Sequence, residues 1–173
     1  MYNRPVLFDK SPTIVEEFTI ESNRRKIAVL FDRSGKEQAG AIQVHPECTS
    51  IATYEVRDIE QEDVIRQFIV KQTMGTQFYI AASWDIAVKL FDLCTLEGLS
   101  ESEIQTYVTS GKKRSMYCMK CYNTSEIPFT SPVQCCCGAH LEVGPYYSKI
   151  RKGYIGYPFV PVEQQQKVGG LVI

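Results

Sequence analysis

The sequence lacks the features that mark several large classes of protein. None of its apolar runs approaches the roughly 18 residues that a membrane-spanning helix needs, so we expect no membrane partner. The opening residues Met1 to Pro5 carry no apolar core of a secretory signal, which favours a cytoplasmic location. No repeat of about 20–50 residues is present, which argues against a solenoid. The 173 residues, 44% hydrophobic and 23% charged, are instead typical of a globular protein.

There is also little net charge, but the charge is unevenly distributed. The chain has 19 Lys and Arg against 20 Asp and Glu, a net charge of −1. Residues 1–110 hold 11 basic and 17 acidic residues, whereas residues 111–173 hold 8 and 3, so the balances are −6 and +5. This asymmetry favours two modules, of which the second meets an acidic partner, although solvated faces of opposite sign would give the same pattern.

Residues 1–111 show alternating strand and helix patterns after an N-terminal arm that ends near residue 23. Short apolar or β-branched runs, each bounded by turn formers, predict strands. These runs lie at residues 26–31, 50–56 and 77–82. Since they are separated by helical patterns, the sequence predicts an α/β fold with a small parallel or mixed sheet and flanking helices.

The helices are predicted from apolar spacing and from capping residues. One helix is expected over residues 60–72 with Asp58 as its N-cap, and another begins after Ser83 and ends at Gly98. The buried face of the second is expected to be Ile86, Ala87, Leu90, Phe91 and Cys94. A capping box from Ser100 to Glu103 predicts a further short helix. That helix would carry Ile104, Tyr107 and Val108.

Seven cysteines are many for a cytoplasmic chain, and five of them fall within 20 residues. These five are Cys118, Cys121, Cys135, Cys136 and Cys137, whereas Cys48 and Cys94 are scattered. A tight cluster in a reducing compartment indicates metal binding rather than disulfides. We therefore predict a zinc-ribbon-like β module over residues 112–160, followed by a flexible tail over 161–173.

The spacing within the cluster predicts four thiolate ligands. Cys118 and Cys121 form a C-x2-C turn, and the second pair is Cys135 with Cys137 or, alternatively, Cys136 with either neighbour; His140 is a reserve ligand. Zn²⁺ is the favoured ion, and a single iron or a [2Fe–2S] cluster would also accept four thiolates. Because four protein ligands close the coordination sphere, a structural role is expected, with no catalytic residue in this chain.

Aromatic and basic residues alternate after the cysteine cluster. This mixture suits a protein interface, in which rings supply buried area and cations steer association. It also suits single-stranded nucleic acid, or a β-hairpin with one aromatic face packed on the module. We predict that a protein partner binds Tyr146, Tyr147, Lys149, Arg151, Lys152 and Tyr154. The small positive balance of the module disfavours nucleic acid.

Residues Gln77–Thr109 resemble the last βα unit of the nucleotide-binding lobe of ferredoxin–NADP reductases. The resemblance lies in the run from Phe78 to Trp84 and in the Gly98-to-Ile104 stretch. The family's functional residues are absent, because Ala81 and Ala82 stand where those reductases place Cys-Gly, and no G-x-G-x-x-G motif occurs. A lobe kept as a scaffold without a bound dinucleotide is therefore expected.

The chain as a whole resembles the small-subunit family of dimethylamine monooxygenase. The resemblance is carried by Cys118, Cys121, Cys137, Gly138, Leu141, Val143, Tyr147, Ser148, Lys149, Tyr154 and Gly156. It implies an accessory, metal-binding subunit of a haem-dependent complex that uses NADPH and dioxygen to demethylate a secondary amine. Haem and flavin would lie on partner oxygenase and reductase subunits, since neither His45 nor His140 has a supporting motif. The alternatives are a small iron or iron–sulfur electron-transfer protein and a zinc-ribbon module that binds nucleic acid or protein.

Overall fold

The computed structural model describes residues 4–20, 26–43, 50–57 and 59–161. The chain divides into two compact units, one over Met1–Lys112 and the other over Lys113–Ile173. In the described part of the chain, no helix is long and apolar enough to cross a membrane. The predicted tail lies outside the described residues from residue 162 onward.

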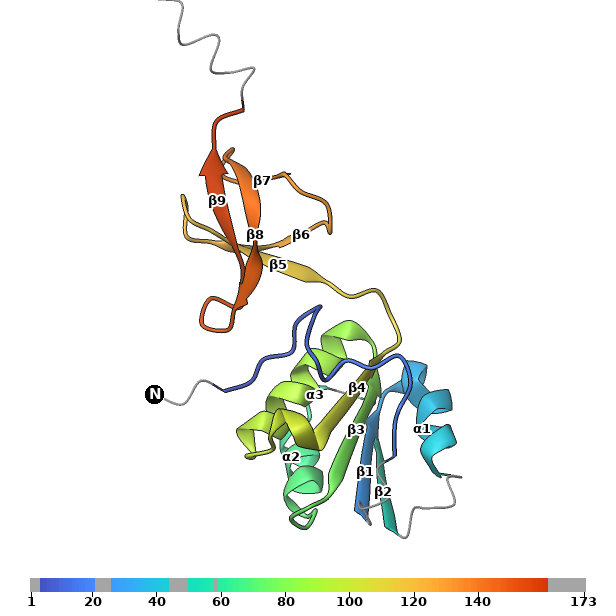
Figure 1. Ribbon diagram of the computed structural model, residues 1–173. Helices are drawn as coiled ribbons and strands as arrows, with labels where there is room; N and C mark the ends of the chain where they lie inside the picture. Colours follow the sequence, from blue (N-terminus) through green and yellow to red (C-terminus); the bar gives the residue numbers. More distant parts are fainter. Residues whose placement is uncertain (1–3, 21–25, 44–49, 58, 162–173) are drawn as a thin grey trace, which may run out of the picture. The chain divides into compact units, whose positions relative to one another are not determined.

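The first unit is built on a four-stranded parallel sheet with the order β2-β1-β3-β4 (Figure 1). Its strands are β1 (Lys26–Phe31), β2 (Ser50–Glu55), β3 (Gln77–Ala82) and β4 (Ile104–Val108). The three strands predicted from apolar runs are confirmed, and every residue of β3 is buried, as expected for a central strand. The α/β class of this unit is confirmed as well.

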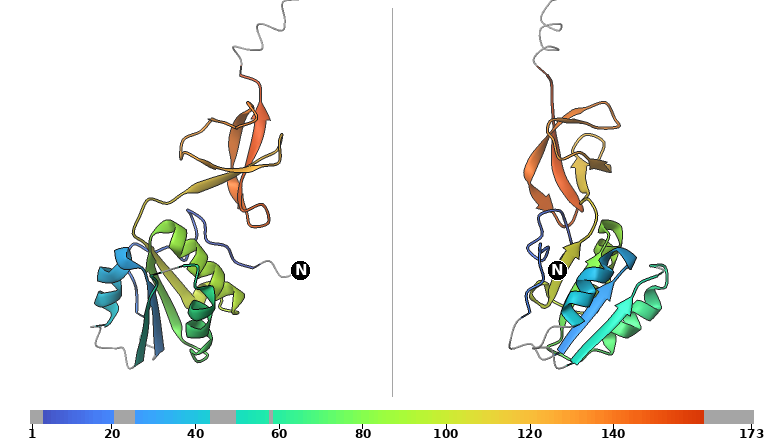
Figure 2. Two further views of the ribbon diagram at one scale, coloured as in Figure 1. Left: turned by 180° about the vertical axis from the view of Figure 1, so that it is seen from behind. Right: turned by 90° about the vertical axis from the view of Figure 1, so that its right-hand side faces the viewer.

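Helices cover both faces of this sheet (Figure 2). Helices α2 (Glu62–Val70) and α3 (Trp84–Leu96) pack on one face, where Leu30, Ile65 and Leu90 share a buried cluster. On the other face, α1 (Lys36–Gln43) follows a short 3-10 helix, η1 (Arg33–Gly35), and buries Ile42 against Val29 and Tyr79. Sequence reasoning missed α1, because Gly35 and Gly40 indicate a turn or loop.

The helix ends differ from the predictions in two details. Helix α2 begins at Glu62 after Gln61, and the predicted cap, Asp58, lies outside the described residues. Ser83 does precede α3, but its side chain makes no capping hydrogen bond. Its hydroxyl donates to Asp32 instead, at 2.9 Å.

The helix predicted after Ser100 is wrong. The capping box between Ser100 and Glu103 is present, but it closes only a single 3-10 turn, η2 (Glu101–Glu103). The chain then enters β4, which pairs with β3 from Phe78↔Ile104 to Ala82↔Val108. A run of β-branched and aromatic residues gains more from completing the buried sheet than from continuing a helix.

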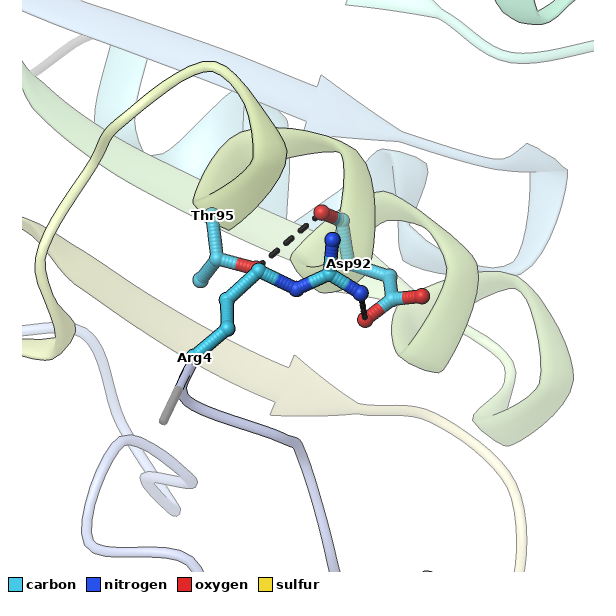
Figure 3. Close-up of polar contacts among 3 residues, drawn as sticks. All are labelled: Arg4, Asp92 and Thr95. Atoms are coloured by element: carbon cyan, nitrogen blue, oxygen red, sulfur yellow. Dashed lines mark hydrogen bonds and ion pairs between the residues drawn. The ribbon is translucent and has the colours of Figure 1, made fainter. Parts of the chain in front are cut away.

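The N-terminal arm closes the β4 edge of the sheet. Ile14 forms an isolated parallel bridge with Thr106, whose N–H donates to Thr13 O at 2.7 Å. At the start of the arm, Arg4 Nη2 lies 3.1 Å from Asp92 Oδ1 of α3, and Thr95 Oγ1 donates to the Asp92 carbonyl (Figure 3). The arm therefore protects an edge that would otherwise expose unpaired backbone groups.

The second unit is a five-stranded mixed sheet with the order β6-β5-β9-β8-β7. Its strands are β5 (Arg114–Cys118), β6 (Thr124–Ile127), β7 (Val133–Gln134), β8 (His140–Ser148) and β9 (Gly153–Phe159). Only β5 and β9 run parallel; the other pairs are antiparallel. A small core forms around Met116 and Leu141, and it includes the buried cysteines Cys118 and Cys135.

Candidate metal centre

The first pair of cysteines lies on the turn that joins β5 to β6. Cys118 N–H donates to the Asn123 carbonyl at 3.0 Å, and Tyr122 N–H donates back to the Cys118 carbonyl at 2.9 Å. These bonds fold residues 118–123 into a tight loop, so that the thiols of Cys118 and Cys121 point to the same side. Tyr122 completes the loop in the left-handed region, with φ of 62°.

The second pair lies on the turn that joins β7 to β8, and this turn is one residue shorter. Cys135 N–H donates to the Ala139 carbonyl at 2.9 Å, and Gly138 N–H donates to the Cys135 carbonyl at 2.8 Å. Gly138 has φ of 79°, so it occupies the same left-handed position after the second ligand as Tyr122 does. Equivalent hydrogen bonds thus close both turns, which explains how a C-x-C spacing can replace C-x2-C.

The two turns lie at opposite edges of the sheet order, yet their sulfurs meet. Cys118, Cys121, Cys135 and Cys137 each offer a sulfur, and all four sulfurs lie within 4.8 Å of one another. The Sγ–Sγ distance is 3.9 Å between Cys118 and Cys137 and 3.6 Å between Cys121 and Cys135. The four cysteines therefore form a group able to hold one metal ion.

Gly156 on the central strand β9 lets the two halves of the module approach. A Cβ at this position would lie 2.6 Å from Met116 Sδ and 3.1 Å from Leu141 Cδ1. Met116 comes from β5 and Leu141 from β8, so their contact across Gly156 brings the strands that carry the two turns together. The central strand β9 thus decides how closely the ligand pairs can meet.

The remaining candidate ligands stand apart from this group. The Cys136 sulfur lies 3.8 Å from that of Cys135, but the Cys136 side chain is exposed and outside the four-sulfur set. His140 pairs with Gln134 at the start of β8 and its ring lies 6.1 Å from that of Phe159, so it is not a ligand in this arrangement. Cys94 is buried in the core of the first unit, and Cys48 lies outside the described residues.

The electrostatics of the group call for a cation. Burial opposes ionisation of the Cys118 thiol, but the backbone N–H groups of Cys121 and Lys120 lower its pKa to about 7. The Cys137 N–H favours the Cys135 thiolate, yet burial and the neighbouring thiols raise the pKa of Cys135 to about 12. Ionisation of Cys118 is thus favoured while that of Cys135 is opposed, and a divalent cation would supply the charge that stabilises several neighbouring thiolates.

The predicted partner residues lie along the hairpin of β8 and β9. Tyr146 is 84% exposed, and Ile150 at the tip is 78% exposed between basic residues. Tyr154 is only 1% exposed, because its ring is covered by Tyr147 at 5.4 Å and by the Arg114 guanidinium at 4.1 Å. A partner on this surface would therefore contact the residues around Tyr154 and not its ring.

A second polar cluster, which sequence reasoning missed, lies at the carboxyl ends of β1 and β3 in the first unit. In an open parallel sheet the strand order reverses between these two strands, and ligands commonly bind there. Asp32 Oδ1 accepts from the N–H groups of Ser34 and Gly35 at 2.8 and 3.0 Å, and also from the Ser34 hydroxyl. Asp32 Oδ2 accepts from the N–H and the hydroxyl of Ser83, both at 2.9 Å.

Asp32 therefore occupies the backbone donors that a phosphate group would use. Burial opposes its ionisation, but the hydrogen bonds from Ser34, Ser83 and Gly35 outweigh burial and lower the pKa of this carboxyl. Trp84 N–H, at the start of α3, is likewise taken by the Ser110 hydroxyl at 2.9 Å. A dinucleotide would have to displace the Asp32 carboxylate, which gives a physical reason to expect a scaffold here. The sequence signal was an acidic residue directly after a buried strand, where nucleotide-binding loops place glycine.

Comparison of the chain with protein families, with characterised proteins and with solved structures found no match.

Proposed function

We propose that Cys118, Cys121, Cys135 and Cys137 bind a single Zn²⁺ ion that holds the second unit in its fold. The observation that carries this proposal is the convergence of four sulfurs within 4.8 Å from two separate turns. Zinc–thiolate bonds of about 2.3 Å in a tetrahedron place the sulfurs about 3.8 Å apart. The distances of 3.6 and 3.9 Å between sulfurs of opposite turns lie close to that value.

A structural role follows from the number of ligands and from the size of the core. Four thiolates leave no coordination position for water or substrate, so the bound ion supplies cross-linking and not Lewis-acid chemistry. The core beneath the site is small, and two of its buried members, Cys118 and Cys135, are themselves ligands. Binding free energy is then folding free energy, as in other small metal-dependent modules.

The iron alternatives differ in what they demand of the sulfurs. A [2Fe–2S] cluster places two irons and two sulfides between its thiolate pairs, so the pairs lie farther apart than around a single ion. Sulfurs that are all within 4.8 Å therefore favour a mononuclear site. A single iron would fit the same tetrahedron, and its colour separates it from zinc.

We further propose that the chain is a non-catalytic, accessory subunit of an oxygenase complex of the dimethylamine monooxygenase type. The support is the family resemblance of residues 115–156, together with the closed four-cysteine site and the Asp32 cluster. In that cluster, the carboxylate occupies the backbone donors that a dinucleotide would need. In such a complex, haem and flavin would be bound by the partner subunits. The end of the β8–β9 hairpin, where Tyr146, Arg151 and Lys152 are exposed and Lys149 is half-buried, is the surface that we propose docks onto them.

The metal proposal is tested by elemental analysis and an optical spectrum of the purified full chain. We expect one zinc per chain and no absorption in the visible range. A coloured preparation that bleaches on reduction and contains iron would overturn zinc and select the electron-transfer alternative. Absence of any metal after purification without chelator, and after addition of Zn²⁺, would refute the site altogether.

The proposal of an oxygenase complex needs a separate test, because a zinc site by itself names no partner. Co-expression with oxygenase subunits encoded beside this chain should yield a complex on size-exclusion chromatography. Reversing the charges of Lys149 and Lys152 to Glu should weaken that complex without loss of zinc, because neither residue belongs to the four-cysteine group. A charge reversal at Lys71, on the first unit, serves as the control. A chain that forms no complex would refute this proposal and leave the metal site standing.

A further inference from the structure

The first unit contains a cavity that neither the metal site nor the Asp32 cluster uses. Its volume is about 340 Å³, which lies in the range of small-molecule sites. The cavity is formed where the N-terminal arm passes from the β4 edge to the face of the sheet that carries α1. Its lining includes Glu16, Glu17, Phe18, Gln38, Ile42 and Tyr107.

The floor of the cavity is apolar and partly aromatic. Ile42 of α1 is buried, and Phe18 packs against the same cluster. The Phe18 ring meets Tyr79 edge-on, with centroids 5.2 Å apart, and lies 6.0 Å from the Tyr107 ring. Aromatic faces of this kind attract organic cations as well as apolar groups.

Hydrogen bonds to the Thr19 backbone hold the wall of the cavity in place. Thr19 N–H donates to Gln105 Oε1 at 2.9 Å, and Gln105 Nε2 donates to the Thr19 carbonyl at 2.7 Å. The Tyr79 hydroxyl donates to the same carbonyl at 3.0 Å. The residue next to Phe18 is therefore anchored to two strands of the sheet, so the cavity is formed before any ligand binds.

Three of the polar groups along this cavity are hydrogen-bond acceptors that lack a partner within the described ranges. Glu16 and Glu17 are exposed carboxylates that form no ion pair with a described residue. The Gln38 side-chain oxygen is buried and has no hydrogen-bond partner among the described residues. Because that oxygen has almost no accessible surface, the exposed carboxylates of Glu16 and Glu17 are the acceptors that a ligand in the cavity can reach.

We propose that this cavity binds a small organic cation with an apolar body, of the arylalkylammonium class. The apolar body would pack on Phe18 and Ile42, and the ammonium group would lie beside the exposed carboxylates of Glu16 and Glu17 that line the cavity. An anion is disfavoured by both carboxylates, and a neutral apolar ligand would gain no attraction from them. The proposal concerns the first unit alone and is independent of the metal site.

Two probes of nearly equal size test the proposal: phenethylammonium and its uncharged analogue, phenethyl alcohol. Each is titrated into the full, zinc-loaded chain, and binding is followed by NMR chemical shifts of the first unit. We expect the cation to bind about tenfold more tightly than the alcohol, since both the rings and the carboxylates favour the charge. Glu16→Gln and Glu17→Gln should each weaken binding of the cation by about threefold, and the double variant should remove its advantage.

A matched control is Glu37→Gln, which removes an exposed carboxylate in the first turn of α1 outside the cavity lining. This variant should bind both probes like the unmodified chain. Equal affinity for the two probes, binding of neither, or equal effects of Glu37→Gln and Glu16→Gln would each overturn the proposal. Zinc content should remain at one ion per chain in every variant if that separate proposal holds, so a failure here cannot be mistaken for a failure of the metal site.

Discussion

Replacing Asp32 by alanine would remove the carboxylate that ties the carboxyl ends of β1 and β3 together. In the structure this group accepts hydrogen bonds from three backbone N–H groups and two hydroxyls. Asp32 is only 5% exposed, so water cannot easily replace the lost acceptor. The substitution therefore leaves the N–H groups of Ser34, Gly35 and Ser83 without their partner.

The size of the effect follows from these bonds. A hydrogen bond to a charged group contributes about 1.5–3 kcal/mol, but bonds to one carboxylate are not additive, and removal also relieves its burial cost. We expect Asp32→Ala to lower the free energy of unfolding of the first unit by about 3 kcal/mol. Asp32→Asn keeps one acceptor oxygen but turns an amide N–H group toward backbone donors, so a loss of about 2 kcal/mol is expected.

The stabilisation should depend on pH with a definite sign. The pKa of the Asp32 carboxyl is lowered from its ordinary value of 3.8 in the folded state, so the charged form is favoured by folding. Its contribution is fully present above the unfolded pKa and is lost as the pH falls through the folded pKa. The stability difference between the unmodified chain and Asp32→Asn should therefore be constant near neutral pH and shrink below about pH 4.

The assay is urea unfolding followed by tryptophan fluorescence. The chain has a single tryptophan, Trp84, which is 7% exposed at the start of α3 and so reports on the first unit. Measuring the difference between two variants at each pH cancels the titration of all other groups. A loss below about 1 kcal/mol for Asp32→Ala, or a difference that does not change in acid, would refute the assigned role.

Three further predictions concern the second unit. Cys137→Ser should abolish zinc binding and make the second unit sensitive to proteolysis, whereas the control Cys136→Ser should retain one zinc per chain. Equal zinc content in the two variants would show that the ligand set is wrong. A strong chelator should unfold the second unit, seen as lost β-sheet circular dichroism, while Trp84 fluorescence stays unchanged because Trp84 belongs to the core of the first unit. A parallel change in Trp84 fluorescence would contradict this. Gly156→Ala should destabilise the second unit by about 1–3 kcal/mol and speed zinc transfer to a chelator, because the methyl group would collide with Met116. Gly111→Ala, whose methyl group meets open space, is the control and should behave like the unmodified chain.

Much of the fold could be predicted from local pattern, and the failures have a common cause. The strands at 26–31 and 77–82 are apolar runs whose side chains are removed from water when the strands are buried in a sheet. Both predictions are confirmed. The segment 104–108 has the pattern of a helix because a capping box precedes it, but its pairing with β3 is a long-range contact that local sequence does not report. Helix α1 is missed because its glycines indicate a loop. The 3-10 turn that leads into it, η1, is capped by Asp32, which also accepts a hydrogen bond from Ser83 beyond the end of β3.

The same division applies to the metal site. The spacing of Cys118 and Cys121 and the cluster that follows were enough to predict a four-thiolate group, since closely spaced cysteines can face one point only through a tight turn. Spacing could not choose among Cys135, Cys136 and Cys137, because adjacent residues in such a turn project in different directions. The hydrogen bonds that close the second turn decide that Cys136 points outward.

The sequence alone thus determined the α/β class of the first unit, because its strands are too apolar to be exposed. It also determined that a thiol cluster is present, one that core packing by itself does not explain. The tertiary structure decided which of those groups meet. It placed β4 and the N-terminal arm at the sheet edge, brought two cysteine turns together across Gly156, and formed a cavity between the arm and α1. These outcomes depend on contacts between segments far apart in the chain, where the free energy comes from packing and pairing that no local pattern encodes.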